Sequence, residues 1–229
     1  MIHCSFSKAG PKERNQDVVL DVLPTAGGFV FAVADGVGGS ANGGLAASRA
    51  ISAVGKFLSS EVGGDLEAAF RAAQSAIRKD DAGKDTATTL TVCRLVEGRV
   101  HFAHVGDSRL YHLRKRGIIT RTNDQTEIAE LVRRGVFTPQ EAKTYPRRNV
   151  LLSAISYSSD YDLEVGSFDI MKDDLLVLCT DGMYNVLNKS DIVALNEKYF
   201  QPRDFCNAAA EWIEERGPVD DYSWVVVRC

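Results

Sequence analysis

Hydrophobic residues along the chain fall into short runs that are rich in β-branched and aromatic side chains and bounded by Gly, Pro, Asn or Asp. Such runs are typical of β-strands. They lie at residues 2–7, 18–22, 28–34, 87–94, 99–105, 110–113, 163–169, 175–179 and 222–227. The dipeptide Glu97-Gly98 between two of these runs predicts the tip of a β-hairpin.

Longer segments carry their hydrophobic residues at the spacing of an α-helix. Residues 43–60 show this spacing, and residues 65–79 begin with an aspartate and end with basic residues, as the helix dipole favours. A second helical pair is predicted near residues 190–198 and 203–215. Because helices come in adjacent pairs between groups of hairpin-linked strands, we predict an α+β fold with antiparallel sheets and helical layers outside them.

Composition narrows the class of protein. The 229 residues contain no repeat or low-complexity linker, so we expect one domain over residues 1–229. A net charge of −4 argues against a nucleic-acid-binding protein with a basic surface. No apolar run is long enough to span a membrane, and residues 1–10 do not resemble a signal peptide. The five cysteines are scattered, which argues against disulfides and favours a cytoplasmic protein.

Aspartates stand at the ends of several predicted strands. The sequences FAVADGVGG and DLLVLCTDG both follow an apolar run with an Asp-Gly pair, at Asp35 and Asp181. The other acids of this kind are Asp17, Asp107, Asp220 and Asp221. A single aspartate is a common turn residue, and coincidence is the alternative interpretation. Converging carboxylates, however, repel one another unless cations hold them, and an all-oxygen shell selects Mg²⁺ or Mn²⁺ over zinc.

The glycines after Asp35 agree with a metal site. Gly36 lets its carbonyl approach a metal, and Gly38 and Gly39 permit backbone conformations that a Cβ excludes. An enzyme that uses a nucleophilic side chain is weakly supported, since Ser108 in GDSR lies in no nucleophile elbow. The histidines also lack the spacing of metal ligands.

Seven motifs occur in a fixed order between about residue 4 and residue 227. They are RNQD, VADGVGG, TATTLTV, HVGDSRLY, TNDQT, CTDGMY and DDYSWVVV. In this order they resemble the metal-dependent Ser/Thr protein phosphatases, the PPM or type 2C family, in its compact bacterial form. The resemblance implies a four-layer α-β-β-α sandwich, in which two mainly antiparallel sheets lie between helix pairs.

The resemblance also implies roles for individual residues. Asp35 would bridge two Mg²⁺ or Mn²⁺ ions, Gly36 would offer its carbonyl to one of them, and Asp181 and Asp220 would complete the ligands.

Two further aspartates have outer positions in the family pattern. Asp17 would hold metal-bound water, and Asp107 would share a weaker third ion with Asp181.

The implied reaction is hydrolysis of phosphoserine or phosphothreonine in proteins by a hydroxide that bridges the two ions. No covalent intermediate is needed, which agrees with the missing nucleophile. The implied partners are phosphorylated proteins made by a Ser/Thr kinase, and we expect a monomer that binds neither nucleic acid nor membrane. The alternatives are a catalytically silent phosphatase-like domain with a regulatory or binding role and, less favoured, a two-metal nuclease.

Residues 123–149 match the flap of the bacterial members. We expect an aspartate at the start, a helix to Arg134, a break at Gly135 and a second helix from Thr138-Pro139. The arginines at positions 133, 134, 147 and 148 either face an anionic phosphopeptide or form a solvated basic face.

The chain departs from the family pattern at two positions. Val37 stands where the family often has His or Met, so a histidine general acid is excluded there. Lys12 occupies the position of the phosphate-binding arginine, and Arg14 competes for that role from a shifted register; a lysine keeps the charge but loses the bidentate contact. For the acidic pair before the last strand, we predict that Asp220 is the ligand and that Asp221 points elsewhere.

Overall fold

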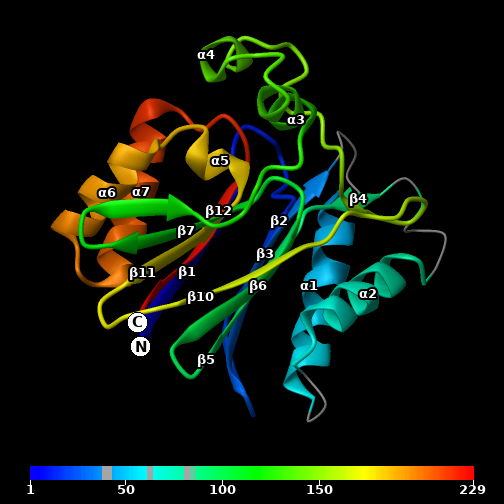
Figure 1. Ribbon diagram of the computed structural model, residues 1–229, viewed down its shortest axis with the longest axis horizontal. Helices are drawn as coiled ribbons and strands as arrows, with labels where there is room; N and C mark the ends of the chain where they lie inside the picture. Colours follow the sequence, from blue (N-terminus) through cyan, green and yellow to red (C-terminus); the bar gives the residue numbers. More distant parts are fainter. Residues whose placement is uncertain (38–42, 61–63, 80–83, 85) are drawn as a thin grey trace.

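The computed structural model describes residues 1–37, 43–60, 64–79, 84 and 86–229. Within these residues two β-sheets pack face to face, and helices cover the outer face of each sheet (Figure 1). The predicted four-layer α-β-β-α arrangement is therefore confirmed. No helix of the described ranges has both the length and the apolar character that a membrane span requires.

The first sheet brings both ends of the chain together. Its strands are entirely antiparallel and lie in the order β1 (Ile2–Lys8), β12 (Tyr222–Arg228), β11 (Leu175–Cys179), β7 (Arg109–Arg114) and β8 (Gly117–Thr120). The two central strands, β11 and β12, are buried at every residue because the second sheet covers one face and helices cover the other. Such strands need continuous apolar runs, which LLVLC and WVVV provide.

The second sheet is also antiparallel. Its strands lie in the order β10 (Glu164–Asp169), β6 (Arg99–Val105), β5 (Leu90–Val96), β3 (Gly28–Val37), β4 (Ala87–Thr88) and β9 (Ile155–Ser156), and β2 (Asp17–Thr25) pairs with β3. The predicted hairpin connects β5 and β6, with φ of +47° at Glu97 and +77° at Gly98. Positive φ at both central residues is the feature of a type I′ turn, whose twist matches that of the strands.

Three apolar clusters hold the layers together. Val33 and Leu178 belong to the cluster between the sheets. Helices α1 (Gly43–Ser59) and α2 (Leu66–Ile77) pack on the second sheet, and Asp65 caps α2 by accepting from the backbone of Glu67. Helices α6 (Lys189–Lys198) and α7 (Pro202–Arg216) pack on the first sheet around residues such as Trp224.

The structure differs from the predicted elements at three places. The predicted strand over residues 87–94 is divided into β4 and β5, because the backbone N–H of Thr89 donates to the carbonyl of Asp35 instead of continuing the ladder (2.9 Å). Strands β8 and β9 were not predicted. Asp181 does not end a strand but begins a short helix, α5 (Asp181–Tyr184), two residues after β11 ends.

The flap contains two short helices that lie beyond one end of the sandwich (Figure 1). Helix α3 (Glu127–Arg133) is capped by Thr126, not by the aspartate that we predicted. Gly135 follows with φ of +72°, which ends the helix as expected. Helix α4 (Pro139–Ala142) begins with a capping box between Thr138 and Glu141.

Candidate metal centre

The predicted carboxylates gather at one end of the sandwich, where both sheets contribute. Asp17 and Asp35 are direct partners across β2 and β3 of the second sheet. Asp181 follows β11 and Asp220 precedes β12, at adjacent ends of these paired strands in the first sheet. Thr180 joins the two sheets, because its hydroxyl donates to Asp17 Oδ2 (2.7 Å). The architecture therefore brings together acids that lie far apart in sequence.

The pKa values of these acids are raised. Burial, and next the negative charge of neighbouring aspartates, raises the pKa of Asp35 well above its ordinary range. Burial raises the pKa of Asp107 to about 7, with the charge of Asp181 as the next cause. Burial raises the pKa of Asp17 to about 7 and that of Asp181 to about 6. The ionised carboxylates are therefore destabilised in the folded protein, and a bound cation would stabilise them.

Two buried oxygens of the cluster have no hydrogen-bond donor. Asp17 Oδ1 and Asp181 Oδ1 accept no hydrogen bond from any described residue. Unsatisfied buried carboxylate oxygens with raised pKa values fit Mg²⁺ or Mn²⁺, which prefer oxygen ligands. In the described ranges, no three acidic, histidine or cysteine side chains already stand at the spacing of metal ligands. The residues therefore suit Mg²⁺ or Mn²⁺ by the chemistry of their oxygen donors, although the described side chains do not form a complete coordination shell.

The backbone around Asp35 is held on both sides by threonines of the TATTLTV motif. The Asp35 N–H donates to Thr89 Oγ1 (3.0 Å), and the Thr88 hydroxyl donates to the Asp35 carbonyl (2.9 Å). Thr89 Oγ1 also shares a hydrogen bond with Ser108 Oγ (3.0 Å), beside Asp107. These contacts fix the end of β3 relative to the GDSR segment.

Gly36 is required by a close backbone contact. A Cβ at this position would lie 2.3 Å from the carbonyl carbon of Gly43, at the start of α1. Gly38 and Gly39 lie outside the described residues, and the approach of the Gly36 carbonyl to a metal stays a prediction.

The two acids before β12 face different surroundings. Asp221 is buried and accepts from the backbone N–H groups of Gly10 (2.9 Å) and Gln16 (2.8 Å). Asp220 instead lines a pocket of about 460 Å³ together with Asp181. This placement supports our choice of Asp220 as the candidate ligand and gives Asp221 a structural role.

Lys12 and Arg14 also differ in position. Lys12 Nζ lies 2.6 Å from Asp220 Oδ1. Burial would lower the pKa of Lys12, but the hydrogen bond and charge of Asp220, and then the charges of Asp221 and Asp35, raise it above its ordinary value. Arg14 is exposed and forms no ion pair within the described residues. The geometry therefore favours Lys12 as the candidate phosphate contact.

Asp107 has a partner that we did not predict. The Tyr184 hydroxyl lies 3.0 Å from the Asp107 carbonyl oxygen and 3.3 Å from Oδ2. The Arg109 guanidinium stacks 3.7 Å above the Tyr184 ring and makes two hydrogen bonds to Asp124. Tyr184 lies within the CTDGMY motif, but nothing in the spacing of that motif indicates this contact.

Comparison with known proteins identifies the family. The model of the protein phosphatase 2C family matches residues 7–215. The chain belongs to this family. It is 32% identical to the serine/threonine protein phosphatase PstP of Mycobacterium tuberculosis over 80% of this chain and 36% of that protein. It is 27% identical to the protein phosphatase PhpP of Streptococcus pneumoniae over 79% of this chain and 78% of that protein.

A solved phosphatase shares the fold. The catalytic domain of PstP in complex with two manganese ions has a TM-score of 0.83 and 27% identity, over 98% of this chain and 96% of that chain. The predicted resemblance to the type 2C family and the predicted enzyme class are confirmed. The roles of the individual site residues stay predictions.

The flap of this phosphatase divides its basic residues into two groups. Glu130 pairs with both Arg133 and Arg134, and Glu127 pairs with Arg147 (2.7 Å), so each of these three arginines has a carboxylate partner within the flap. Arg148 makes no such pair among the described residues; it donates to the carbonyl of Lys143 (2.8 Å).

Arg148 and Lys143 line the same pocket as Asp181 and Asp220, together with Asn149. Of the four flap arginines, Arg148 lines this pocket, and the expectation that the flap faces an anionic phosphopeptide stays a prediction. Lys143 and Asn149 were missed because only the fold shows which side of the flap faces the pocket.

Proposed function

We propose that this phosphatase hydrolyses phosphoserine and phosphothreonine in proteins with the help of two Mg²⁺ or Mn²⁺ ions, and a third, weaker ion at Asp107. The observation that carries the proposal is the cluster of buried and partly buried aspartates at the family's motif positions, with raised pKa values and unsatisfied oxygens. The PstP structure with two manganese ions supports the choice of metal and the number of ions.

The side chains have distinct roles in this proposal. Asp35, Asp181 and Asp220, with the carbonyl of Gly36, would hold the two ions. Asp17 would orient a water molecule, since its Oδ2 is fixed by the Thr180 hydroxyl while Oδ1 stays unsatisfied. The ions, when bound, supply an activated water and screen the charge of the phosphoryl oxygens.

Lys12 would contact the substrate phosphate. Its ammonium group lies against Asp220 and above the carboxylate cluster, where a phosphate would be neutralised as it enters. A phosphate bound here would share the Lys12 ammonium with Asp220, so the ion pair has to rearrange or accept a third partner.

The flap would contact the substrate outside the phosphate. Lys143 and Arg148 are exposed cations that line the same pocket as Asp181 and Asp220, and neither forms an ion pair with a described carboxylate. They suit the acidic groups of a phosphopeptide. The substrates would be products of a protein Ser/Thr kinase, because only such an enzyme supplies these esters.

The test is dephosphorylation of a phosphothreonine peptide by the purified chain with Mn²⁺, with Mg²⁺ and with EDTA. We expect turnover with either ion, none with EDTA, and none for Asp35→Asn. A wild-type chain that binds Mn²⁺ but hydrolyses neither the peptide nor p-nitrophenyl phosphate would establish the silent-domain alternative and refute our proposal.

A further inference from the structure

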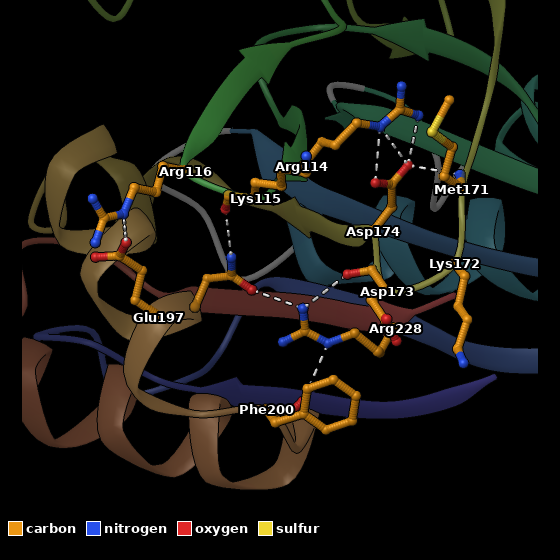
Figure 2. Close-up of a pocket in the computed structure, with 11 residues that line it drawn as sticks. Arg114, Lys115, Arg116, Met171, Lys172, Asp173, Asp174, Glu197, Phe200 and Arg228 are labelled. Carbon is orange, nitrogen blue, oxygen red and sulfur yellow. Dashed lines mark hydrogen bonds and ion pairs between the residues drawn. The ribbon is translucent and has the colours of Figure 1, made fainter.

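A second pocket lies at the opposite end of the central strands. Strand β11 begins directly after Asp174 and runs toward Asp181, and β12 begins two residues after Asp220 and ends at Arg228. Each strand therefore has one end near the carboxylate cluster and the other end at this pocket. It has a volume of about 680 Å³, which is within the range of small-molecule sites. Figure 2 shows its lining, which comes from the β7–β8 turn, the loop before β11, the end of α6 and the end of β12.

The lining is basic in a protein that is acidic overall. Five basic and three acidic side chains line the pocket, whereas the whole chain has a net charge of −4. Arg114 is paired with Asp174 (2.8 Å) and Arg116 with Glu197 (2.6 Å). Lys115 and Lys172 have no ion pair within the described residues (Figure 2). The excess positive charge therefore faces the pocket.

Arg228 adds a buried charge without a carboxylate partner. Its side chain donates to the carbonyls of Tyr199, Phe200 and Asp173, and to Asn196 Oδ1 (2.8 Å), all of which are neutral acceptors. The residue is only 5% exposed. Burial lowers the pKa of Arg228, and the negative charge of Asp173 opposes this effect, so Asp173 offsets part of the guanidinium charge. The lining stays positive because it contains five basic and three acidic side chains.

An exposed aromatic ring stands beside this charge. The Arg228 guanidinium lies 4.9 Å from the centre of the Phe200 ring, and Phe200 is 56% exposed (Figure 2). One face of the ring is thus covered by a cation while much of the side chain is open to solvent. An aromatic side chain in this position offers a stacking surface for a planar group.

Two residues at the rim have positive φ. Lys115 has φ of +54° in the two-residue turn between β7 and β8, and Asp173 has φ of +70° in the turn before β11. Positive φ belongs to the turn at Lys115, as it does at Glu97, and places the Lys115 backbone at the edge of the pocket. Asn196 holds this backbone, since its amide donates to the Lys115 carbonyl while its oxygen binds Arg228.

We propose that this pocket binds a nucleoside phosphate, with the phosphate near Lys115, Lys172 and Arg228 and the base against Phe200. Positive charge and an exposed aromatic ring within one small-molecule-sized pocket suit a ligand that is both anionic and planar. Binding here would leave the carboxylate cluster free, because that cluster lies at the other ends of β11 and β12.

The proposal is tested by calorimetric titration of the full chain with AMP, adenosine and inorganic phosphate, without divalent ions. Without divalent ions the carboxylate cluster repels anions, and variants of the basic pocket distinguish binding there from binding at Lys12 or the flap. We expect saturable AMP binding below about 1 mM, and weaker binding of both fragments. Lys172→Glu and Phe200→Ala should each weaken AMP binding at least about fivefold.

Lys56→Glu is the matched control, because Lys56 is an exposed lysine on α1, on the other sheet. It should bind AMP like the wild type, and all variants should melt near the wild-type temperature and keep their phosphatase activity. Absence of AMP binding, equal weakening by Lys56→Glu, or binding of phosphate as tight as AMP would each overturn the proposal. None of these outcomes depends on whether the proposed phosphatase reaction is correct.

Discussion

Asp174 and Asp181 stand at the two ends of β11 and differ in the partners that the protein gives them. Asp174 is 2% exposed and accepts hydrogen bonds from His112, from Arg114 and from the backbone of Met171. Burial alone would raise its pKa, but these donors hold the pKa below its ordinary value. Asp181 accepts a hydrogen bond from Asn185 (3.2 Å), and its Oδ1 has no donor among the described residues.

The difference between Asp174 and Asp181 is the difference between a structural acid and a candidate metal ligand. Asp174 is buried and Asp181 is partly buried, but only the carboxylate of Asp174 is compensated by the protein itself. Burial and the charge of Asp220 raise the pKa of Asp181 to about 6, which agrees with the proposal that Asp181 binds a cation. The same distinction separates the flap arginines that pair with Glu127 and Glu130 from Arg148, which faces the pocket.

The largest effect is expected on turnover. Asp181→Asn should lower kcat to less than about a tenth of the wild-type value at saturating Mn²⁺, because it removes a metal ligand. Asp174→Asn is the control at the other end of β11, and its folded fraction should keep kcat within about threefold. Phosphopeptide kinetics with near-ultraviolet circular dichroism would decide this. Equal losses in the two variants would mean that the difference between the two ends is not functional.

For stability, unlike turnover, the larger loss is expected from the substitution at Asp174. Asp174→Ala should lower the free energy of unfolding by roughly 2–4 kcal/mol, since it leaves His112 and Arg114 without their acceptor. Because the folded-state pKa of Asp174 lies below 3.8, this stabilisation is present above about pH 4 and is lost as the pH falls through the lower folded-state value. Urea unfolding at pH 7 measures the effect, and a loss below about 1 kcal/mol would show that these hydrogen bonds are not structural.

Variants of the flap test the same distinction among basic residues, between those that line the pocket and those paired with glutamates. The double variant Lys143→Ala/Arg148→Ala should raise KM for an acidic phosphopeptide about tenfold, or about 1.4 kcal/mol, with little change for p-nitrophenyl phosphate. Arg134→Ala should leave both values unchanged, since Arg134 is paired with Glu130 (2.6 Å) and is not among the residues that line the pocket with Asp181 and Asp220. A larger effect from Arg134→Ala would assign the contact to the paired arginines.

The smallest effect concerns the phosphate contact. Lys12→Arg should lower KM, because a guanidinium offers two parallel donors to phosphate. The change should correspond to about 1 kcal/mol or less of binding free energy. Arg14→Ala serves as the competing variant and should change KM less than Lys12→Ala does. Steady-state kinetics of the three proteins would settle the register, and a raised KM for Arg14→Ala alone would exclude Lys12.

Sequence patterns predicted most of the fold and the members of the acidic cluster. Apolar runs such as LLVLC predict strands reliably, because a strand buried on both faces tolerates little else. The family's motif order then pointed to Asp35, Asp181 and Asp220. These signals are local, or follow the chain in order.

The remaining features depend on contacts between distant segments. In KDDLL, nothing distinguishes the buried Asp174 from the exposed Asp173, because the difference comes from His112 and Arg114 on β7. The short helix at Asp181 could not be separated from a strand end by periodicity, since four residues carry too little pattern. The contact between Tyr184 and Asp107 likewise requires the fold.

Urea unfolding of the wild type and of Asp181→Asn, with and without Mn²⁺, tests directly whether Asp181 is a metal ligand. The folded-state pKa of Asp181, about 6, exceeds the ordinary value of 3.8, so its ionised form destabilises the metal-free protein above pH 6. Without metal, Asp181→Asn should be more stable than the wild type by about 1–3 kcal/mol at pH 8, and by less at pH 5. Mn²⁺ should reverse the order at pH 8. A variant that is less stable than the wild type without metal would show that Asp181 is a structural acid like Asp174, and would contradict the account.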